Sequence, residues 1–288
     1  MSKINNIMIT LKDSIVPISD AEFQNISVLV KSRFGINLTD KKKALVSGRL
    51  NKILKVHGFS NFKEYFDSVV NDASGKQLIQ LIDRISTNHT YFYRENEHFR
   101  LLDSLVLPSL FRKFPSLSPD DFKIWCAGCA SGEEAYTTAM VLNDYIGEGH
   151  IWPRSVILGT DISVSALSAA MSGIYPKERL SVLPEGFKRR YMEKTDPDHY
   201  EVTPHVKKMI TFRQLNLMDN HYPFQNKFHM IFCRNVMIYF SQETKEELLE
   251  KLCRNLHPGG YLFIGHSETL GRNHSLFEYV RPALYCKK

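Results

Sequence analysis

Apolar positions in the first 90 residues recur every three or four residues, which is the spacing of helices that bury one face. The first such stretch, 19–35, begins with the capping-box pair Ser19 and Glu22 and ends at Gly35, a residue suited to a helix C-terminus. Its apolar face consists of Phe23, Ile26, Val30 and Phe34. We predict an all-helical N-terminal domain over residues 1–90, with no strand before residue 120.

A second helix is predicted in the stretch 39–58, with Thr39 or Asp40 as its cap. Winding it at about 100° per residue gives an apolar side made of Val46, Leu50, Ile53 and Leu54. Basic residues fall within an arc of roughly 140° on the other side: Lys41, Lys42, Arg49, Lys52 and Lys55. Further helices are predicted at 60–71 and 75–86.

From Phe122 onward, apolar runs of strand length alternate with helical patterns. The strand-like runs are 122–127, 155–161, 209–217, 228–235 and 260–266, and helices are predicted at 133–145, 163–172 and 241–255. This alternation predicts an α/β domain over residues 91–288, with a mostly parallel, Rossmann-like sheet covered by helices on both faces. The stretch 277–288 resembles a last edge strand, because Pro282 argues against a central position.

Residues 174–208 interrupt this rhythm, because they are too many for a simple connection between a helix and a strand. They contain a helical pattern at 178–192, a turn at 194–199 and a strand-like stretch at 200–206. We predict a small β subdomain inserted into the α/β domain.

Composition is that of an ordinary globular protein, with 43% apolar and 24% charged residues in 288. No apolar run has the length of a membrane span, and the first residues lack a signal-peptide pattern. We therefore expect a cytoplasmic protein without membrane insertion, and a monomer. Cys126 and Cys129 form a C-x-x-C pair, but no second pair accompanies them, so we interpret them as buried, reduced thiols and expect no metal.

The net charge of +6 is concentrated near the N-terminus. Residues 1–90 contain 13 Lys and Arg against 8 Asp and Glu, whereas the remaining residues contain 24 against 23. The basic surplus of the helical domain indicates an acidic partner.

Small or polar residues follow four of the predicted strands, where parallel sheets bind ligands. These positions are 127–131, Asp161, 216–217 and 235–236. The turn 128–132 is neither a dinucleotide-binding nor a phosphate-binding glycine loop, and Glu133 and Glu134 would repel a pyrophosphate. Carboxylates suit a cofactor with a positive centre and ribose hydroxyls, which indicates S-adenosylmethionine. Glu133 and Glu134 could alternatively stabilise the helix N-terminus.

Two further clusters lie outside this turn. The stretch 87–96 contains Asn88, Thr90 and Arg94, whose guanidinium could hold a carboxylate, although a domain junction could have the same composition. Tyr239 follows Asn235 by four residues and could face a substrate or pack in the core. Amino-methyltransferases hold their target nitrogen with an Asn/Asp-Pro-Pro-aromatic stretch at a comparable strand end, but no proline follows Asn235.

The stretches STNHTYFYRENEHF, IWCAGCASGEEAYT, LGTDIS, FCRNVMIYF and LHPGGYLFIGHSE occur in this order along the chain. Together they resemble the CheR family of chemotaxis receptor glutamate methyltransferases, over about residues 15–285. The resemblance implies a helical domain followed by an S-adenosylmethionine-dependent domain with an inserted β subdomain. It further implies methyl transfer to glutamates in the cytoplasmic methylation region of membrane chemoreceptors, with S-adenosylhomocysteine as product.

The resemblance also implies the roles of individual residues. The expected cofactor contacts are Asn88, Thr90, Arg94, Glu134, Asp161, Asn216, Leu217, Asn235 and Val236. Arg94 and Tyr239 are expected near the transferred methyl group, and the basic residues of the second helix are expected to bind the receptor. Ala135 stands where family members often have proline, and the turn in the inserted subdomain lacks the glycine that some members use to capture a receptor tail.

Two other functions agree with parts of the pattern. A nucleic-acid methyltransferase could use the basic helical domain to bind phosphates, although the surplus is modest and direct nucleic-acid binding is not expected. A binding module could sense S-adenosylmethionine or the receptor without transferring a methyl group. Turnover, and the kind of acceptor, would separate these functions from the first.

Overall fold

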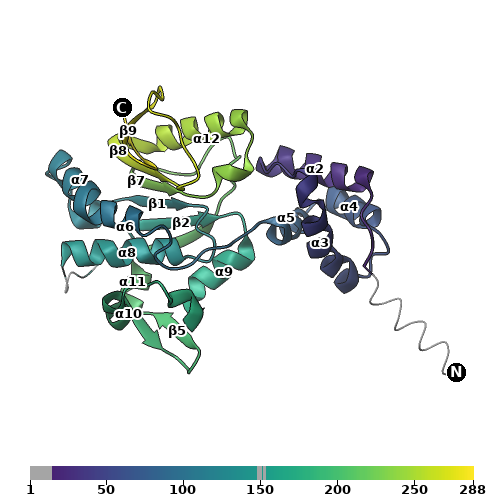
Figure 1. Cartoon of the computed structure of the whole chain (residues 1–288), viewed down its shortest axis with the longest axis horizontal. Coiled ribbons are helices and arrows are strands. Elements are labelled where there is room, and N and C mark those ends of the chain that lie inside the picture. The colour runs from purple at the N-terminus through teal and green to yellow at the C-terminus, as the bar shows by residue number, and fades with distance from the viewer. Residues whose placement is uncertain (1–14, 148–150, 152–153) are drawn as a thin grey trace. The chain divides into compact units, whose positions relative to one another are not determined.

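The computed structural model describes residues 15–147, 151 and 154–288. The chain divides into two compact units, of which one ends at Thr87 and the other runs from Asn88 to Lys288. Figure 1 shows the helices of the first unit and the sheet of the second. The predicted boundary between the two domains lay after residue 90.

The first unit is built from helices, as predicted. They are α2 (Asp20–Phe34), the 3₁₀ helix η1 (Asp40–Lys42), α3 (Lys43–His57), α4 (Phe62–Asn71) and α5 (Lys76–Ile85). Ser19 and Glu22 form the predicted capping box, and Gly35 ends α2 with a left-handed φ of 71°. The predicted apolar faces of α2 and α3 are buried.

The start of the second helix was predicted too early. Lys41 and Lys42 lie in η1, whose tighter winding removes them from the arc calculated for α3. Thr39 precedes η1, but its side chain makes no capping hydrogen bond. Arg49 donates to the carbonyls of Ile85 at 2.6 Å and Ser86 at 3.0 Å, and thus stabilises the C-terminal end of α5.

The second unit contains a seven-stranded sheet in the order β6-β2-β1-β7-β8-β10-β9. Its strands are β1 (Ile124–Ala127), β2 (Ile157–Asp161), β6 (Ile210–Gln214), β7 (Phe228–Cys233), β8 (Leu256–Ile264), β9 (Phe277–Arg281) and β10 (Leu284–Lys287). The first five strands in this order pair in parallel, so their carboxyl ends lie at one edge. This arrangement confirms the predicted α/β class.

Side chains of β1 alternate between two apolar layers. Ile124 and Cys126 belong to the layer under α8 (Glu133–Ile146), whereas Trp125 and Ala127 belong to the layer under α12 (Gln242–Asn255). Figure 1 shows α8 and α12 on opposite faces of the sheet. Burial on both faces explains why the central strands have continuous apolar runs.

Three consecutive segments, α6 (Glu97–Leu101), the π-helical η2 (Leu102–Val106) and α7 (Leu107–Lys113), were not predicted. Their spacing was readable, because Phe99, Leu102, Val106 and Leu110 are all buried at helical intervals. The remaining helical elements of the sheet unit are η3 (Pro119–Asp121), α9 (Val164–Ser172) and η5 (Met237–Tyr239).

The inserted subdomain is present as predicted. It comprises β3 (Ile174–Pro176), η4 (Lys177–Leu180), α10 (Glu185–Tyr191), β4 (Met192–Lys194), β5 (His199–Val202) and α11 (Pro204–Lys208). Its three strands form a separate antiparallel sheet in the order β3-β5-β4. Tyr175 and Val202 are buried in the layer that also contains residues of α8.

The prediction of a single edge strand at the C-terminus was wrong. The stretch forms a hairpin in which β10 lies between β8 and β9, so only β9 is at the edge. Pro282 and Ala283 connect the two strands, and Ala283 has a left-handed φ of 58°. Because Pro282 lies in the turn, its missing N–H removes no hydrogen bond from the sheet.

The cysteines agree with the prediction made for them. All five cysteines are free and buried, including Cys126 and Cys129. Within the described ranges, no helix combines the length and hydropathy needed to cross a bilayer.

Candidate functional site

The turn after β1 is fixed to the end of β2 by backbone hydrogen bonds. The N–H groups of Gly128 and Cys129 donate to the carbonyl of Thr160 at 2.8 and 2.9 Å. Gly128 has a φ of 76°, and a β-carbon there would come within 2.5 Å of Cγ2 of Val236. Glycine therefore allows the loops that follow β1 and β7 to approach each other closely.

Asp161 organises the crevice at the end of β2. Its Oδ2 accepts the N–H of Ala130 at 2.8 Å, and its Oδ1 accepts the N–H of Ser163 at 2.9 Å. The Ser163 hydroxyl in turn accepts from Nδ2 of Asn88 at 3.0 Å. Two of the predicted cofactor residues, Asn88 and Asp161, are thus joined through Ser163.

Asn216 and Leu217 form the loop after β6, which is the next strand along the sheet. The backbone N–H of Leu215 donates to the carbonyl of Asp161 at 3.1 Å, so this loop begins beside the end of β2. Nζ of Lys251, which is buried on α12, donates to the carbonyls of Leu217 and Met218 at 3.3 and 3.1 Å. Lys251 therefore fixes the conformation of a predicted cofactor loop.

Glu133, the first of the paired glutamates, has a side chain that is 0% exposed. It accepts hydrogen bonds from Nη1 of Arg179 in the inserted subdomain at 3.1 Å and from the Ser131 hydroxyl at 2.7 Å. Arg179 also donates to the carbonyl of Thr90. Burial raises the pKa of Glu133 in spite of these partners. Its contacts join the crevice to the insert.

Glu134, the second glutamate, faces a different arginine. Its Oε2 lies 3.0 Å from Nη1 of Arg234, whose side chain is only 2% exposed. Nη2 of the same guanidinium donates to Oε2 of Glu95 at 3.0 Å and to the backbone carbonyl of Arg94 at 2.6 Å. Burial raises the pKa of Glu134, and the charge of Arg234 acts against that increase.

Glu95 connects this cluster to the loop after β7. Its Oε1 accepts Nδ2 of Asn235 at 3.1 Å. Burial would raise the pKa of Glu95, but the charge of Arg234 and the hydrogen bond from Asn235 outweigh burial, and the pKa is lowered. Glu95 is therefore ionised at neutral pH.

Arg94 lies in a tightly turned segment. The residues on either side of it, Tyr93 and Glu95, have φ values of 61° and 54°, a backbone region that residues other than glycine seldom adopt. Its own Nη1 donates to the carbonyl of His89 at 2.7 Å. This predicted catalytic residue therefore lies between two residues with unusual backbone conformations.

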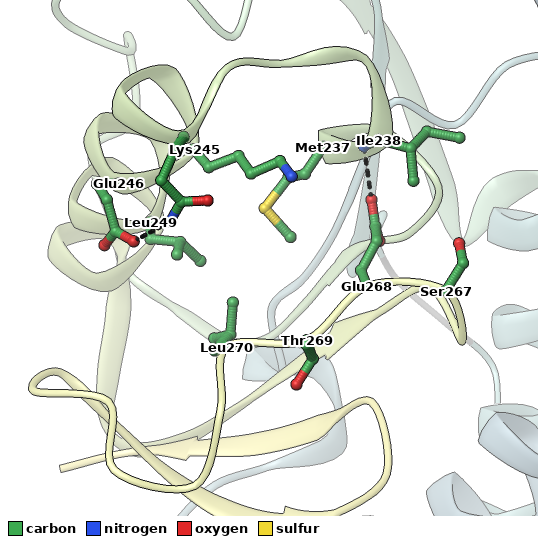
Figure 2. A pocket seen from close by; sticks show the side chains of 10 residues that line it. Met237, Ile238, Lys245, Glu246, Leu249, Ser267, Glu268, Thr269 and Leu270 are labelled. Atoms are coloured by element: carbon green, nitrogen blue, oxygen red, sulfur yellow. Dashed lines mark hydrogen bonds between the residues drawn. The ribbon is translucent and has the colours of Figure 1, made fainter.

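The loop that carries Asn235, Val236 and Tyr239 is held from behind by Glu268. Oε2 of Glu268 accepts the N–H of Gly265 at 2.6 Å and of Asn235 at 3.0 Å, and Oε1 accepts the N–H of Ile238 at 3.1 Å. Figure 2 shows this last hydrogen bond beside a pocket between α12 and the loops that follow β7 and β8. Tyr239 ends η5 in the same loop and is half-buried.

His98 is fully buried beside this cluster. Neither of its ring nitrogens has a hydrogen-bond partner among the described residues. Burial, reinforced by the charges of Arg234 and His266, lowers its pKa to about 3. Ligand atoms of Glu95, His98 and His266 lie within 4.8 Å of one another, but a cation there would adjoin the buried guanidinium of Arg234. We assign no metal to this group.

Three residues that organise the crevice were not predicted: Arg234, Glu95 and Glu268. Arg234 had a readable signal, because an arginine directly after the apolar run 228–233 is placed to be buried and paired. Glu95 stands next to Arg94 in a stretch already selected for its polar residues. No local pattern indicated Glu268, since its role depends on three backbone groups from two loops.

The donor set agrees with S-adenosylmethionine. Carboxylates from Glu134 and Asp161 lie at the carboxyl ends of β1 and β2, where an ammonium group and ribose hydroxyls could be held. The backbone N–H groups of the turn are already bonded to Thr160 and Asp161, so they do not form a phosphate cradle.

Matches to known proteins agree with S-adenosylmethionine as the cofactor. Residues 88–286 match the model of the CheR methyltransferase, SAM binding domain, and residues 21–86 match that of the CheR methyltransferase, all-alpha domain. The chain is 46% identical over 272 residues to a chemotaxis protein methyltransferase of Borreliella burgdorferi, covering 94% of this chain and 96% of the relative.

More distant relatives extend the comparison. Identity is 33% over 267 residues to chemotaxis protein methyltransferase 1 of Pseudomonas aeruginosa, covering 91% of this chain and 95% of the relative. Among solved structures, PKMT2 from Rickettsia typhi in complex with AdoHcy is 19% identical, with a TM-score of 0.33 over 55% of this chain and 25% of that chain. That likeness is too low to support an argument.

The sheet, its crevice and the matched model define the class of the second unit, which is an S-adenosylmethionine-binding methyltransferase domain. The chain belongs to the CheR methyltransferase family, with both of the family's domains present. The predicted family, fold class and cofactor are confirmed.

Proposed function

We propose that the protein transfers the methyl group of S-adenosylmethionine to glutamate side chains of chemoreceptors and forms methyl esters. The observation that carries the proposal is the crevice itself, in which Glu134 and Asp161 lie at the carboxyl ends of neighbouring strands while Arg94 and Tyr239 belong to adjoining loops. The names of the relatives, which are chemotaxis protein methyltransferases, support the acceptor class.

The reaction requires alignment more than proton transfer. A glutamate side chain with its usual pKa near 4.3 is ionised at pH 7, so its oxygen is nucleophilic without a general base. His98, with a pKa of about 3, would be a very weak base at neutral pH. S-adenosylmethionine supplies a methyl group on a positively charged sulfur, and the approach of a carboxylate neutralises that charge, so a dry site favours transfer.

Individual residues have separate roles in the proposed reaction. Glu134 binds the methionine amino group, and Asp161, fixed by the N–H groups of Ala130 and Ser163, binds the ribose hydroxyls. Asn88, Thr90, Asn216, Leu217, Asn235 and Val236 complete the proposed cofactor contacts. Arg94 orients the acceptor carboxylate through its guanidinium, and Tyr239 lies beside the acceptor.

The helical unit supplies a surface for the receptor. Lys52 and Lys55 are exposed on α3, with Lys41 and Lys42 in the preceding η1, and acidic receptor segments would be attracted to this face. Arg49 contributes less to this surface than the sequence suggested, because its guanidinium binds the carbonyls at the end of α5.

The test is incubation with methyl-labelled S-adenosylmethionine and a receptor cytoplasmic fragment, followed by mild alkali. Release of volatile labelled methanol is expected, because carboxyl methyl esters hydrolyse under alkali. A fragment with its candidate glutamates replaced by glutamine is the matched control and should accept no label. Alkali-stable label would contradict the proposal and indicate nitrogen or nucleic-acid methylation, and binding of the cofactor without any label would indicate a sensor.

A further inference from the structure

One guanidinium joins the three segments that form the proposed active site. Arg234 follows β7, Arg94 and Glu95 precede α6, and Glu134 begins α8. The three acceptors are the Glu134 carboxylate at 3.0 Å, the Glu95 carboxylate at 3.0 Å and the Arg94 carbonyl at 2.6 Å. A planar fork of donors can satisfy acceptors in several directions at once, which a lysine cannot do.

Burial makes this arrangement energetically demanding. The Arg234 side chain is 2% exposed, and its Nε has no hydrogen-bond partner among the described residues. Two carboxylates bonded to one guanidinium give these three groups an excess of negative charge, which the nearby charge of Arg94 and a cationic ligand would offset. The amino group of S-adenosylmethionine is such a ligand, so the excess indicates a site prepared for it.

The charged and titratable groups around Glu134 come from several elements. They are Arg94 and Glu95 before α6, Cys126 on β1, Cys129 in the following turn, Cys233 at the end of β7, and Arg234. Burial raises the pKa of all three thiols well above its usual value, so they are neutral near pH 7. His98 and His266 lie on the Glu95 side of Arg234. Arg234 is the cation bonded to Glu134 itself.

We propose that Arg234 is a positioning residue that keeps the Glu134 carboxylate ionised for the cofactor amino group and holds the backbone of Arg94 in place. This inference rests on the proposed cofactor role of Glu134 and on the proposed role of Arg94. It assigns Arg234 two separable effects, one on cofactor affinity through Glu134 and one on turnover through Arg94.

The first effect has a characteristic pH dependence. Without Arg234, burial of Glu134 is opposed by no directly bonded cation, so its carboxyl would be protonated at a higher pH. The charged, binding-competent form then becomes more abundant as pH rises. Cofactor affinity in an Arg234→Met variant should therefore be weak at about pH 6 and recover by about pH 8, whereas a loss of packing alone would weaken binding equally at both values.

The experiment measures the Kd of S-adenosylhomocysteine by calorimetry over that pH range, without receptor. Arg234→Met should bind at least about tenfold more weakly than wild type at the lower pH and should approach wild type at the upper pH. In a Glu134→Gln background, Arg234→Met should add no pH dependence. A pH slope equal to that of wild type, or one that persists in the Glu134→Gln background, would overturn the inference.

Lys251→Met is the matched control. Lys251 is another buried cation at this edge of the sheet, but it donates to the carbonyls of Leu217 and Met218 rather than to a carboxylate. Any loss of affinity in Lys251→Met should be the same at both ends of the pH range. A slope matching that of Arg234→Met would show a general effect of removing a buried cation, and would count against the inference.

Arg234→Lys tests the second effect and keeps the test valid if Arg234→Met does not fold. One ammonium preserves the positive charge but cannot bond all three acceptors. Affinity for S-adenosylhomocysteine should stay within about threefold of wild type, while turnover on the receptor fragment should fall at least about tenfold. Normal turnover in this variant would overturn the inference, whatever Arg234→Met does.

Absence of methylation by wild type would count against the proposed function, because the binding measurements involve no receptor. Normal affinity in Glu134→Gln alone would remove the cofactor role of Glu134.

Discussion

Glu133 and Glu134 are neighbours at the start of one helix, yet they belong to two different regions. Glu133 faces the inserted subdomain, where its partner Arg179 is 40% exposed. Glu134 faces the crevice, where its partner Arg234 is 2% exposed. Both carboxyl groups have pKa values raised by burial. The two glutamates differ in the other groups that their partner arginines contact.

On the insert side, the contacts of the arginine have a structural role. Arg179 joins Glu133 to the carbonyl of Thr90 and so holds the insert against the crevice. On the crevice side, Arg234 bonds Glu134 together with the backbone of the predicted catalytic Arg94. The same residue pair, glutamate and arginine, therefore stabilises the fold in one region and is proposed to prepare chemistry in the other.

The largest effect is expected from Arg94 on the crevice side. Arg94→Ala should lower kcat for receptor methylation at least about a hundredfold, because the acceptor carboxylate loses its orienting cation. The thermal midpoint should change little. Arg100→Ala, which removes an exposed arginine from α6, is the control and should retain wild-type turnover. Near-normal turnover in Arg94→Ala would remove Arg94 from the mechanism.

A direct test of the comparison exchanges each glutamate for its neutral isostere. Glu134→Gln should weaken S-adenosylhomocysteine binding about 10- to 100-fold, the value of a hydrogen bond to a charged group. Glu133→Gln should leave the Kd within about threefold and lower the thermal midpoint by about 2–8 °C. Equal effects of the two changes on Kd, measured by calorimetry, would erase the distinction between the regions.

A smaller effect is expected at the basic face of the helical unit. Reversal of both Lys52 and Lys55 to glutamate should raise KM for the receptor about 3- to 10-fold at low salt and leave cofactor affinity unchanged. The difference should shrink as salt increases, because exposed charges are screened. Lys76→Glu changes an exposed lysine on α5, outside this face, and should have little effect on KM. An unchanged KM in the double variant would indicate that this basic face contacts only solvent and does not bind the receptor.

The smallest effect concerns the pH dependence of stability. The raised pKa of Glu133 means that its contribution to stability decreases as pH rises through its folded value, whereas the lowered pKa of Glu95 means that its contribution is lost as pH falls. Between about pH 4 and 7, the difference in thermal midpoint between wild type and Glu133→Gln should narrow as pH rises. The difference from Glu95→Gln should widen, each by roughly 2–4 °C. If the two differences in thermal midpoint changed in the same direction with pH, the opposite pKa shifts assigned to Glu133 and Glu95 would be contradicted.

Much of the fold followed from local pattern. The capping box at Ser19, the apolar face of α3 and the strand–helix alternation after Phe122 are short-range signals, and the structure confirms them. The misreadings have local causes as well. The hairpin at the C-terminus looked like one strand because Pro282 was assigned to a strand when it lies in a turn. The helical spacing of 97–113 was present but was not used.

The sequence by itself determined the family, the cofactor and the strand ends at which polar residues gather, because each depends on short motifs in a fixed order. Only the tertiary structure decided which partner each charged residue has. Arg49 binds the end of α5, Glu133 binds the insert, and Arg234 is joined to both Glu95 and Glu134. Residues separated by up to 140 positions form the Arg234 cluster, and a buried charge is stabilised by whatever opposite charge the fold brings within about 4 Å. Such pairing has no local signature, so it becomes visible only when the strands and loops are assembled.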